Sequence, residues 1–301
     1  MIDNRIISVS ADDFHKDFNS NAFMFRVVTR ALLLDGFPMR RVCRISSGVC
    51  AVFRSGKVVV KIFPDNRFVW GSDERYNSEL FAYKRFFADY ISAPRLVSHG
   101  SVDAKYHFKY MIFPFIPGVT LRNLRIPPDN EKKRIFAKQM DKITLLINFP
   151  EQSVNSIDVL ENARKSDAFS SMPQSFIDER LEAIDAYRPN CYKFTHGNLT
   201  RDNILVGHDD RLYVTGFSHA CNAPIEYETA PLVIDLFGLD PAYIRGYYGL
   251  YDSFELTERV LIGALIHENG FDLLTNAFGD ITDISHVNML RDKIFKQIKL
   301  R

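Results

Sequence analysis

Cysteine, surplus charge and long apolar runs are all scarce in this 301-residue sequence. The four cysteines are Cys43, Cys50, Cys191 and Cys221. They include no C-x-x-C pair, and they are too few for the disulfide framework of a small secreted protein. This scarcity argues against a zinc site and against a disulfide scaffold, so we expect buried thiols.

The charge balance excludes another group of partners. Lysine and arginine total 38 against 37 aspartates and glutamates, so the chain has no cationic surplus for non-specific binding to nucleic acid or an acidic membrane. No run approaches the ~20 apolar residues that span a bilayer, and the N-terminal segment has acids where a secretory signal has basic residues. We expect a cytoplasmic protein with a small-molecule or protein ligand, and without nucleic-acid or membrane partners.

The pattern of elements predicts an α+β protein with two lobes. Residues 12–34 have the periodicity of a helix, residues 41–63 contain three short strands, and two more strand-like runs follow Pro94. Beyond Pro117 and Gly118 the pattern is mostly helical, apart from a short hairpin at 204–214. We therefore expect a small antiparallel β lobe at 1–117 and a mainly helical lobe at 118–301.

Two charged residues in the first lobe have two interpretations each. Lys61 stands in the apolar strand KVVVKIF, where a charge either points to solvent from an edge or needs a buried partner. Glu79 begins the helix expected at 78–90, where a carboxylate favours the helix dipole in any protein. Neither residue alone indicates a function.

The segment at 194–220 is the most informative part of the chain. It contains FTHGNLTRDNILV, then a hairpin, then VTGFSHA. This region resembles the H-G-D-x-x-x-x-N-I-L-V loop and the following I-D-F-G of aminoglycoside phosphotransferases and choline kinases. His196, Gly197 and Asn203 match in register. The resemblance covers roughly residues 41–270, including MIFPFIPGVTLRNL and PIEYETAPLV, and implies the two-lobed protein-kinase-like fold.

The resemblance also assigns roles to residues of the first lobe. It implies that Lys61 holds the phosphates of ATP and that Glu79 pairs with this lysine. Ser47 and Gly48, in the turn SSGVC, become weak candidates for phosphate contact. The expected cofactor is therefore ATP.

Two carboxylates of the family pattern are missing. Asn198 replaces the aspartate that accepts the hydroxyl proton of the phosphate acceptor, and Gly216 stands where a magnesium-binding aspartate is expected. Asn203 alone would hold Mg²⁺ weakly or not at all, because Mg²⁺ is usually bound through one or two carboxylates. The candidate catalytic residues are thus His196, Asn198 and Asp202, the last as a substitute acid.

Three hypotheses follow for function. The first is a pseudokinase, which binds a nucleotide or another ligand, has impaired phosphoryl transfer and acts by binding or regulation. The second is an active small-molecule phosphotransferase in which Asn198 orients the acceptor hydroxyl and Asp202, or an acid elsewhere, handles the proton or the metal. The third is a different transfer chemistry on the same fold, such as nucleotidyl transfer.

Overall fold

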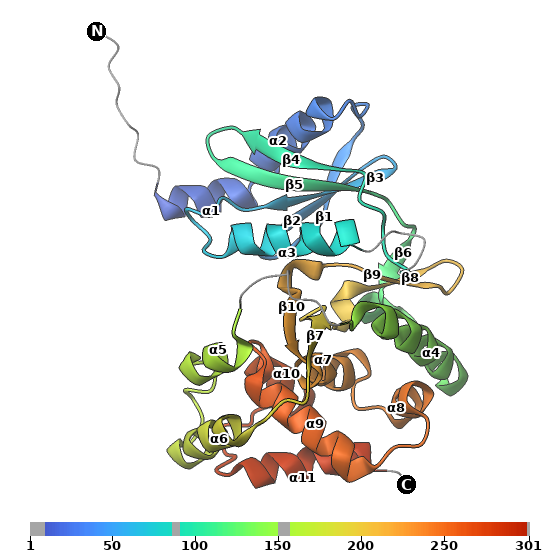
Figure 1. Cartoon of the computed structure of the whole chain (residues 1–301). Coiled ribbons are helices and arrows are strands. Elements are labelled where there is room, and N and C mark those ends of the chain that lie inside the picture. The colour runs from blue at the N-terminus through green and yellow to red at the C-terminus, as the bar shows by residue number, and fades with distance from the viewer. Residues whose placement is uncertain (1–9, 86–90, 150–156, 300–301) are drawn as a thin grey trace. The chain divides into compact units, whose positions relative to one another are not determined.

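The computed structural model describes residues 10–85, 91–149 and 157–299 (Figure 1). Their contacts divide the chain into two compact units, one from residues 1–88 and 94–116 and one from residues 89–93 and 117–301. The backbone N–H of Val214 donates to the carbonyl of Ser92 at 2.8 Å, which ties the short segment before Pro94 to the second unit.

The first unit contains five strands and three helices among its described residues. They are α1 (Ala11–Asn19), α2 (Asn21–Leu34), β1 (Val42–Ser47), β2 (Ala51–Ser55), β3 (Val58–Phe63), α3 (Ser72–Arg85), β4 (Ser98–Asp103) and β5 (His107–Pro114). The strands form one antiparallel sheet in the order β1-β2-β3-β5-β4. The expected antiparallel β lobe is confirmed.

The two faces of strand β3 bury different partners. Val60 and Ile62 point to one face, where they join a core with Phe14 and Val28 of α1 and α2. Lys61 and Phe63 point to the other face, which α3 covers (Figure 1). Because β3 lies inside the sheet, the edge position that would expose Lys61 to solvent does not exist.

Two helix boundaries differ from the sequence prediction. The single helix expected at 12–34 is two helices, because Ser20 ends α1 and its hydroxyl then accepts the backbone N–H of Phe23 at 3.3 Å as the N-cap of α2. Helix α3 begins at Ser72, not Ser78. Glu79 therefore lies in mid-helix, and the interpretation based on the helix dipole is wrong for it.

The second unit is mainly helical. Its elements are β6 (Gly118–Thr120), η1 (Leu121–Asn123), α4 (Asn130–Ile147), α5 (Val159–Lys165), α6 (Gln174–Ala186), β7 (Tyr192–Thr195), η2 (Arg201–Asn203), β8 (Ile204–Gly207), β9 (Leu212–Val214), η3 (Phe217–His219), β10 (Cys221–Pro224), α7 (Ile225–Pro231), the π-helical turn η4 (Leu232–Leu236), α8 (Pro241–Tyr248), α9 (Ser253–Ile266), α10 (Gly270–Phe278) and α11 (Val287–Ile298).

Two small sheets support the loop that the sequence singled out. The predicted hairpin is confirmed as β8 and β9, and β6 pairs with the free edge of β8. Strands β7 and β10 pair antiparallel on either side of the hairpin in sequence. The segment from 194 to 224 is therefore held at both ends by backbone hydrogen bonds.

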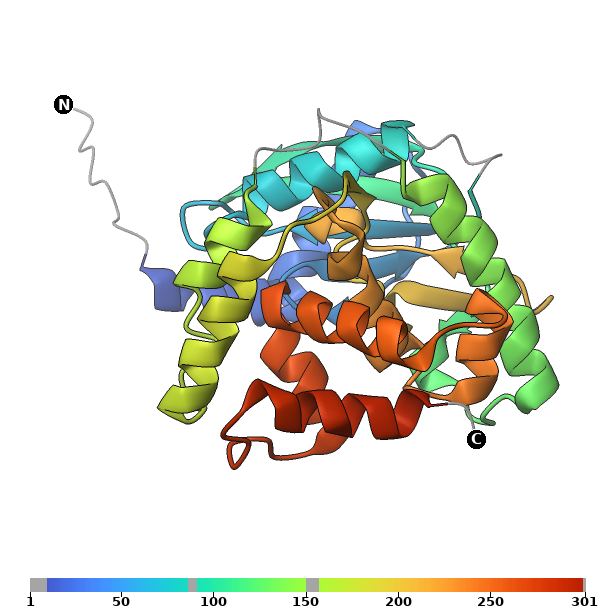
Figure 2. The same cartoon turned by 60° about the horizontal axis from the view of Figure 1, so that its bottom comes forward.

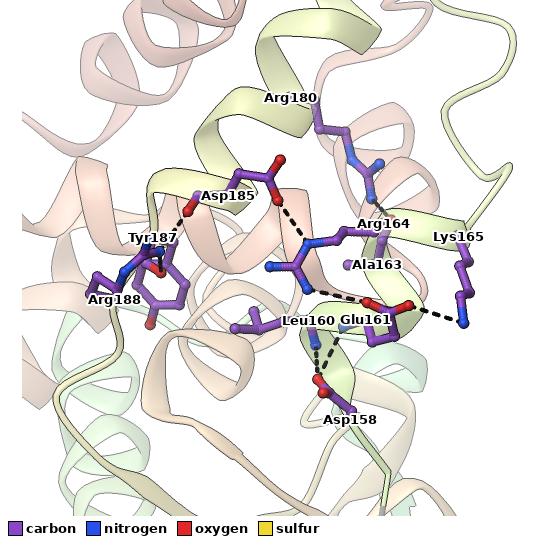
Figure 3. A network of polar contacts seen from close by, with 10 residues as sticks. All are labelled: Asp158, Leu160, Glu161, Ala163, Arg164, Lys165, Arg180, Asp185, Tyr187 and Arg188. Carbon is purple, nitrogen blue, oxygen red and sulfur yellow. Dashed lines mark hydrogen bonds and ion pairs between the residues drawn. The ribbon is translucent and has the colours of Figure 1, made fainter.

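Helices α5 and α6 are joined by a polar network, which Figure 3 shows from close by. Arg164 of α5 donates to Asp185 of α6 at 2.8 Å, and Asp158 caps the N-terminus of α5. Arg180 is almost fully buried and donates to the carbonyls of Ala163 and Leu265 at 2.8 and 3.0 Å. These contacts link α5, α6 and α9.

Two expectations about composition can be compared with the structure. Cys221 is buried and Cys50 half-buried, but Cys43 and Cys191 are exposed, so the expectation of buried thiols is wrong for those two. Within the three described stretches, no helix has the length and apolar character needed to cross a membrane.

Candidate functional site

In the first unit, Lys61 and Glu79 form a buried ion pair. The Lys61 Nζ lies 2.5 Å from the Glu79 Oε2, and the Glu79 side chain is only 1% exposed. Burial lowers the pKa of Lys61, but the charge of Glu79 outweighs this and raises the pKa above its ordinary value. The predicted contact between Lys61 and Glu79 thus exists, and it places a charged ammonium on the face of the sheet that α3 covers.

The turn between β1 and β2 carries the two residues proposed for phosphate contact. Gly48 is exposed, and its backbone N–H donates to the carbonyl of Cys50 at 3.3 Å. Ser47 is the last residue of β1, and its side chain lies outside the described part of the structure. Phosphate contact by Ser47 and Gly48 stays a prediction.

In the second unit, His196 positions the loop that contains Asn198. Its imidazole is buried beside the ring of Phe217, and Nε2 donates to the carbonyl of Thr215 at 2.9 Å. Nδ1 accepts the backbone N–H of Asn198 at 3.2 Å. These partners assign the neutral tautomer with the proton on Nε2. His196 therefore connects the backbone at Asn198 to the backbone at Thr215 and fixes the position of the loop.

Asn203 and Gly216 face each other across the hairpin. The Asn203 Nδ2 donates to the carbonyl of Asn198 at 2.7 Å. Gly216 has φ of 80° and ψ of 47°, and a Cβ added there would lie 2.5 Å from the Asn203 Oδ1. A side chain at 216 would thus share space with the Asn203 amide oxygen, which supports the sequence register.

These donors do not fit a magnesium ion of the kind the family pattern implies. The Asn203 Oδ1 is a neutral oxygen, and Gly216 contributes no side chain where the carboxylate is expected. Mg²⁺ gives up its water reluctantly and is usually held through one or two carboxylates. Asn203 and Gly216 therefore lie close enough for side chains at both positions to share a metal ion, but neither residue supplies a negative charge.

Asp202 is engaged by an arginine from another element. The Arg122 Nε donates to the Asp202 Oδ2 at 2.7 Å, and Nη2 of the same guanidinium donates to the Asp235 Oδ2 at 2.6 Å. The other Asp235 oxygen accepts the backbone N–H of Arg201 at 2.7 Å. The structure therefore gives Asp202 an ion-pair partner in η1, and its role as a substitute acid stays a prediction.

Two buried residues that the sequence analysis did not assign bind the backbone of the loop that contains Asn198. The Glu228 Oε2 accepts the backbone N–H of Gly197 at 3.0 Å, and the His267 Nε2 donates to the carbonyl of Gly197 at 2.9 Å. Burial raises the pKa of Glu228 to about 7 and lowers the pKa of His267 to about 4. The signal in the sequence was the acidic stretch PIEYETAPLV, but nothing marked His267.

A second unpredicted feature is a histidine–carboxylate pair beside the loop. The His219 Nδ1 lies 2.5 Å from the Glu268 Oε1, and the backbone carbonyl of His219 would be 2.0 Å from a Cβ at position 197. His219 therefore lies against Gly197, next to Asn198 in the chain. Among the described residues, no hydrogen bond is formed by Nε2 of His219.

Comparison with known proteins decides the family. A family model described as "Phosphotransferase enzyme family" matches residues 42–260, which is most of the chain. The chain belongs to the phosphotransferase enzyme family. No curated protein sequence matches it.

Solved structures of aminoglycoside phosphotransferases have the same fold at low sequence identity. A GDP complex of aminoglycoside 2′-phosphotransferase-IIIa is 17% identical with a TM-score of 0.60, covering 92% of this chain and 99% of that one. A thermostable mutant of aminoglycoside phosphotransferase APH(4)-Ia, with AMP-PNP and hygromycin B, is 15% identical with a TM-score of 0.59, covering 90% and 98%.

A choline/ethanolamine kinase family protein from Mesorhizobium loti is 14% identical with a TM-score of 0.52, covering 90% of this chain and 92% of that one. These likenesses confirm the expected α+β, two-lobed kinase-like fold. They also confirm the resemblance to aminoglycoside phosphotransferases and choline kinases.

In this family member, the opposite pKa shifts of Glu228 and His267, which both bind Gly197, predict a measurable pH dependence of stability. Between about pH 4.5 and 7, unfolded Glu228 is ionised while the folded protein keeps the proton, so its contribution to stability falls as pH rises. His267 acts in the opposite direction, because its folded pKa is lowered. We expect Glu228→Gln to remove only the pH dependence that Glu228 causes. As the pH rises from 5 to 7.5, the free energy of unfolding of the variant should therefore increase by about 1–3 kcal/mol relative to that of wild type.

Denaturant unfolding at each pH measures this difference, and the effect of His267 cancels because both proteins contain it. Glu255→Gln, at an exposed position near the start of α9, controls for removal of one carboxylate from the same unit. A difference between Glu228→Gln and wild type that stays constant across this pH range would contradict the assignment.

Proposed function

We propose that this family member is a pseudokinase: it binds a nucleotide, transfers phosphoryl groups poorly and acts through ligand binding or regulation. The observation that carries the proposal is the pair Asn198 and Gly216. Both positions keep their place in the loop and the hairpin, yet neither has a carboxylate. Phosphoryl transfer depends mainly on positioning and charge neutralisation, and these two replacements weaken both.

Nucleotide binding is supported by the buried cation of the first unit. Lys61 stays charged because Glu79 accompanies it into the interior, and an ammonium is a suitable partner for phosphate oxygens. Solved structures with the same fold include a complex with GDP and a complex with AMP-PNP and hygromycin B. Within the proposal, ATP is the first nucleotide to test.

Impaired transfer is supported by the lack of a free carboxylate at the expected positions of the base and the metal ligand. An amide at 198 cannot accept a proton at neutral pH, and loss of a general base typically costs ~10²- to 10⁴-fold in rate. Asp202, the nearest acid in the loop, already neutralises Arg122. Without a carboxylate at 216, a bound metal would be held by Asn203 and phosphate oxygens only.

Thermal unfolding with ATP, with and without Mg²⁺, tests the proposal together with a hydrolysis assay. We expect ATP to raise the Tm by a few degrees at saturation without measurable turnover, because binding to the folded state alone stabilises it. Lys61→Ala should abolish the shift, whereas Lys57→Ala, an exposed lysine of the same hairpin, should retain it. Turnover that needs both Lys61 and Mg²⁺ would contradict impaired transfer, and absence of any ATP-dependent shift would contradict nucleotide binding.

Restoring both carboxylates gives a second test. The double variant Asn198→Asp/Gly216→Asp should bind ATP about tenfold more tightly when Mg²⁺ is present, equal to ~1.4 kcal/mol. Aspartate tolerates the left-handed backbone of Gly216, and the atoms in the way of its Cβ belong to the end of the Asn203 side chain. Asn198→Asp alone is the matched control, since it adds charge away from the metal position. If Mg²⁺ changes the ATP affinity of both variants equally, Gly216 does not occupy the position of the metal-binding aspartate.

His219 and Glu268 favour a second candidate, an active phosphotransferase with rearranged residues. In this scheme the acceptor hydroxyl passes its proton to Nε2 of His219 as its oxygen bonds to the terminal phosphorus of ATP, and ADP leaves. Glu268 would hold Nδ1 and stabilise the charged imidazole, as carboxylates do for catalytic histidines. Asn198 would orient the hydroxyl.

If turnover is found, His219→Gln should lower kcat by ~10²-fold or more while leaving KM nearly unchanged. Glu268→Gln should show a smaller loss, because the imidazole remains. His208→Gln, at an exposed histidine in the turn between β8 and β9, is the control. No turnover under any condition, or turnover that is insensitive to His219→Gln, would exclude this second candidate.

A further inference from the structure

A pocket of about 400 Å³ lies among helices α4, α8 and the C-terminal end of α11. Figure 2 shows the end of α11 beside α8 and α4. The polar side chains that line the pocket are Asn130, Arg134, Arg245, Lys296, Gln297 and Lys299. Four of these six are cationic and none is acidic. The pocket belongs entirely to the second unit and shares no residue with the loop at 194–220.

Close packing of two helices brings the arginines together. A Cβ at Gly246 of α8 would lie 2.8 Å from the Cβ of Ala137 and 2.9 Å from the Cα of Arg134, both on α4. The glycine therefore lets α8 lie directly against α4. As a consequence Arg134 and Arg245, which flank this contact, line one cavity.

Two aspartates that neighbour the lining residues in sequence are directed to other partners. Asp240, which precedes α8, accepts from the Lys133 Nζ at 2.7 Å and from the backbone N–H of Ala242 at 2.8 Å. Asp129, which precedes α4, caps that helix by accepting the backbone N–H of Lys132 at 2.8 Å. Within the described part of the chain, Arg134, Lys296 and Lys299 make no ion pair.

This concentration of charge is local. The whole chain has a formal charge of only +1, so four cations around one cavity are offset by acids elsewhere on the molecule. Like charges that line one concave surface repel one another, and a bound anion relieves that repulsion. The predominantly polar lining excludes an apolar ligand as the best fit.

We propose that this pocket binds a small molecule with two or more phosphate groups. Guanidinium groups hold phosphate oxygens bidentately, and lysine ammonium groups supply point charges, so the lining can satisfy several phosphate oxygens at once. A volume of about 400 Å³ is large enough for a pyrophosphate or a phosphorylated sugar. The same chemistry is presented by a soluble phosphate ester and by a phosphorylated lipid headgroup, and the experiment below separates them.

Pyrophosphate is the probe, titrated calorimetrically into the full-length protein in phosphate-free buffer with EDTA. We expect one site that Arg134→Gln/Lys296→Gln weakens at least tenfold, because each lost charge-assisted hydrogen bond contributes substantially to binding. Lys142→Gln, at an exposed lysine further along α4 and outside the pocket, should bind like wild type. Circular dichroism and the Tm confirm that each variant is folded.

Lys61→Ala separates this site from the proposed nucleotide site. If pyrophosphate binding survives in Lys61→Ala and is lost in Arg134→Gln/Lys296→Gln, the pocket is the binding site whether or not the protein binds ATP. The reverse pattern, or an equal loss in Lys142→Gln, would overturn the proposal.

Co-sedimentation with vesicles that contain a phosphoinositide supplies the second arm. Vesicle binding that depends on Arg134, together with pyrophosphate binding at the pocket, would identify the headgroup as the source of the phosphates. Pyrophosphate binding without vesicle binding would identify a soluble ester. Vesicle binding without pyrophosphate binding would overturn the small-molecule site.

Discussion

The candidate site depends on how the peptide groups of Gly197 are held. Glu228 from α7 accepts its N–H, and His267 from the end of α9 donates to its carbonyl. The backbone has φ of +74°, and a Cβ would meet the carbonyl of His219 at 2.0 Å, so only glycine fits. The position of Asn198 follows from this clamp and from His196 on the other side of the loop.

The clamp is made from ionisable side chains that burial drives towards their neutral forms. A carboxyl with a pKa of about 7 and an imidazole with a pKa of about 4 can both be neutral near pH 6, which reduces the cost of burying them. The Gly197 N–H still needs an acceptor and its carbonyl a donor, and both are supplied. The loop geometry is therefore maintained by groups that are separate from the missing carboxylates.

Much of the fold and part of the site could be predicted from the sequence because the signals are local. The alternation in KVVVKIF placed Lys61 on one face of a strand, and the helical pattern after it supplied Glu79, although the helix begins six residues earlier than predicted. The spacing from His196 to Asn203 and the hairpin after it located Gly216 opposite Asn203.

The contacts that the sequence did not reveal join residues far apart in the chain. Arg122 reaches Asp202 and Asp235 across 80 and 113 positions, and His267 reaches Gly197 across 70. Each of these residues has ordinary neighbours in sequence, so no periodicity or turn signal marks it. Likewise, the cations of the pocket lie on α4, on α8 and at the end of α11, and they become a cluster only when these three elements come together in the fold.

Gly216 has a consequence for the entropy of the unfolded chain. Glycine loses more conformational freedom on folding than any other residue, but at φ of 80° it adopts without strain a left-handed conformation that L side chains rarely adopt. The obstacle to a side chain there is the end of Asn203 alone, with no backbone in the way. A carboxylate at 216 would therefore be favoured by the smaller entropy loss on folding, and opposed by the strain of the left-handed backbone and by the Asn203 amide, whereas glycine avoids both of these obstacles.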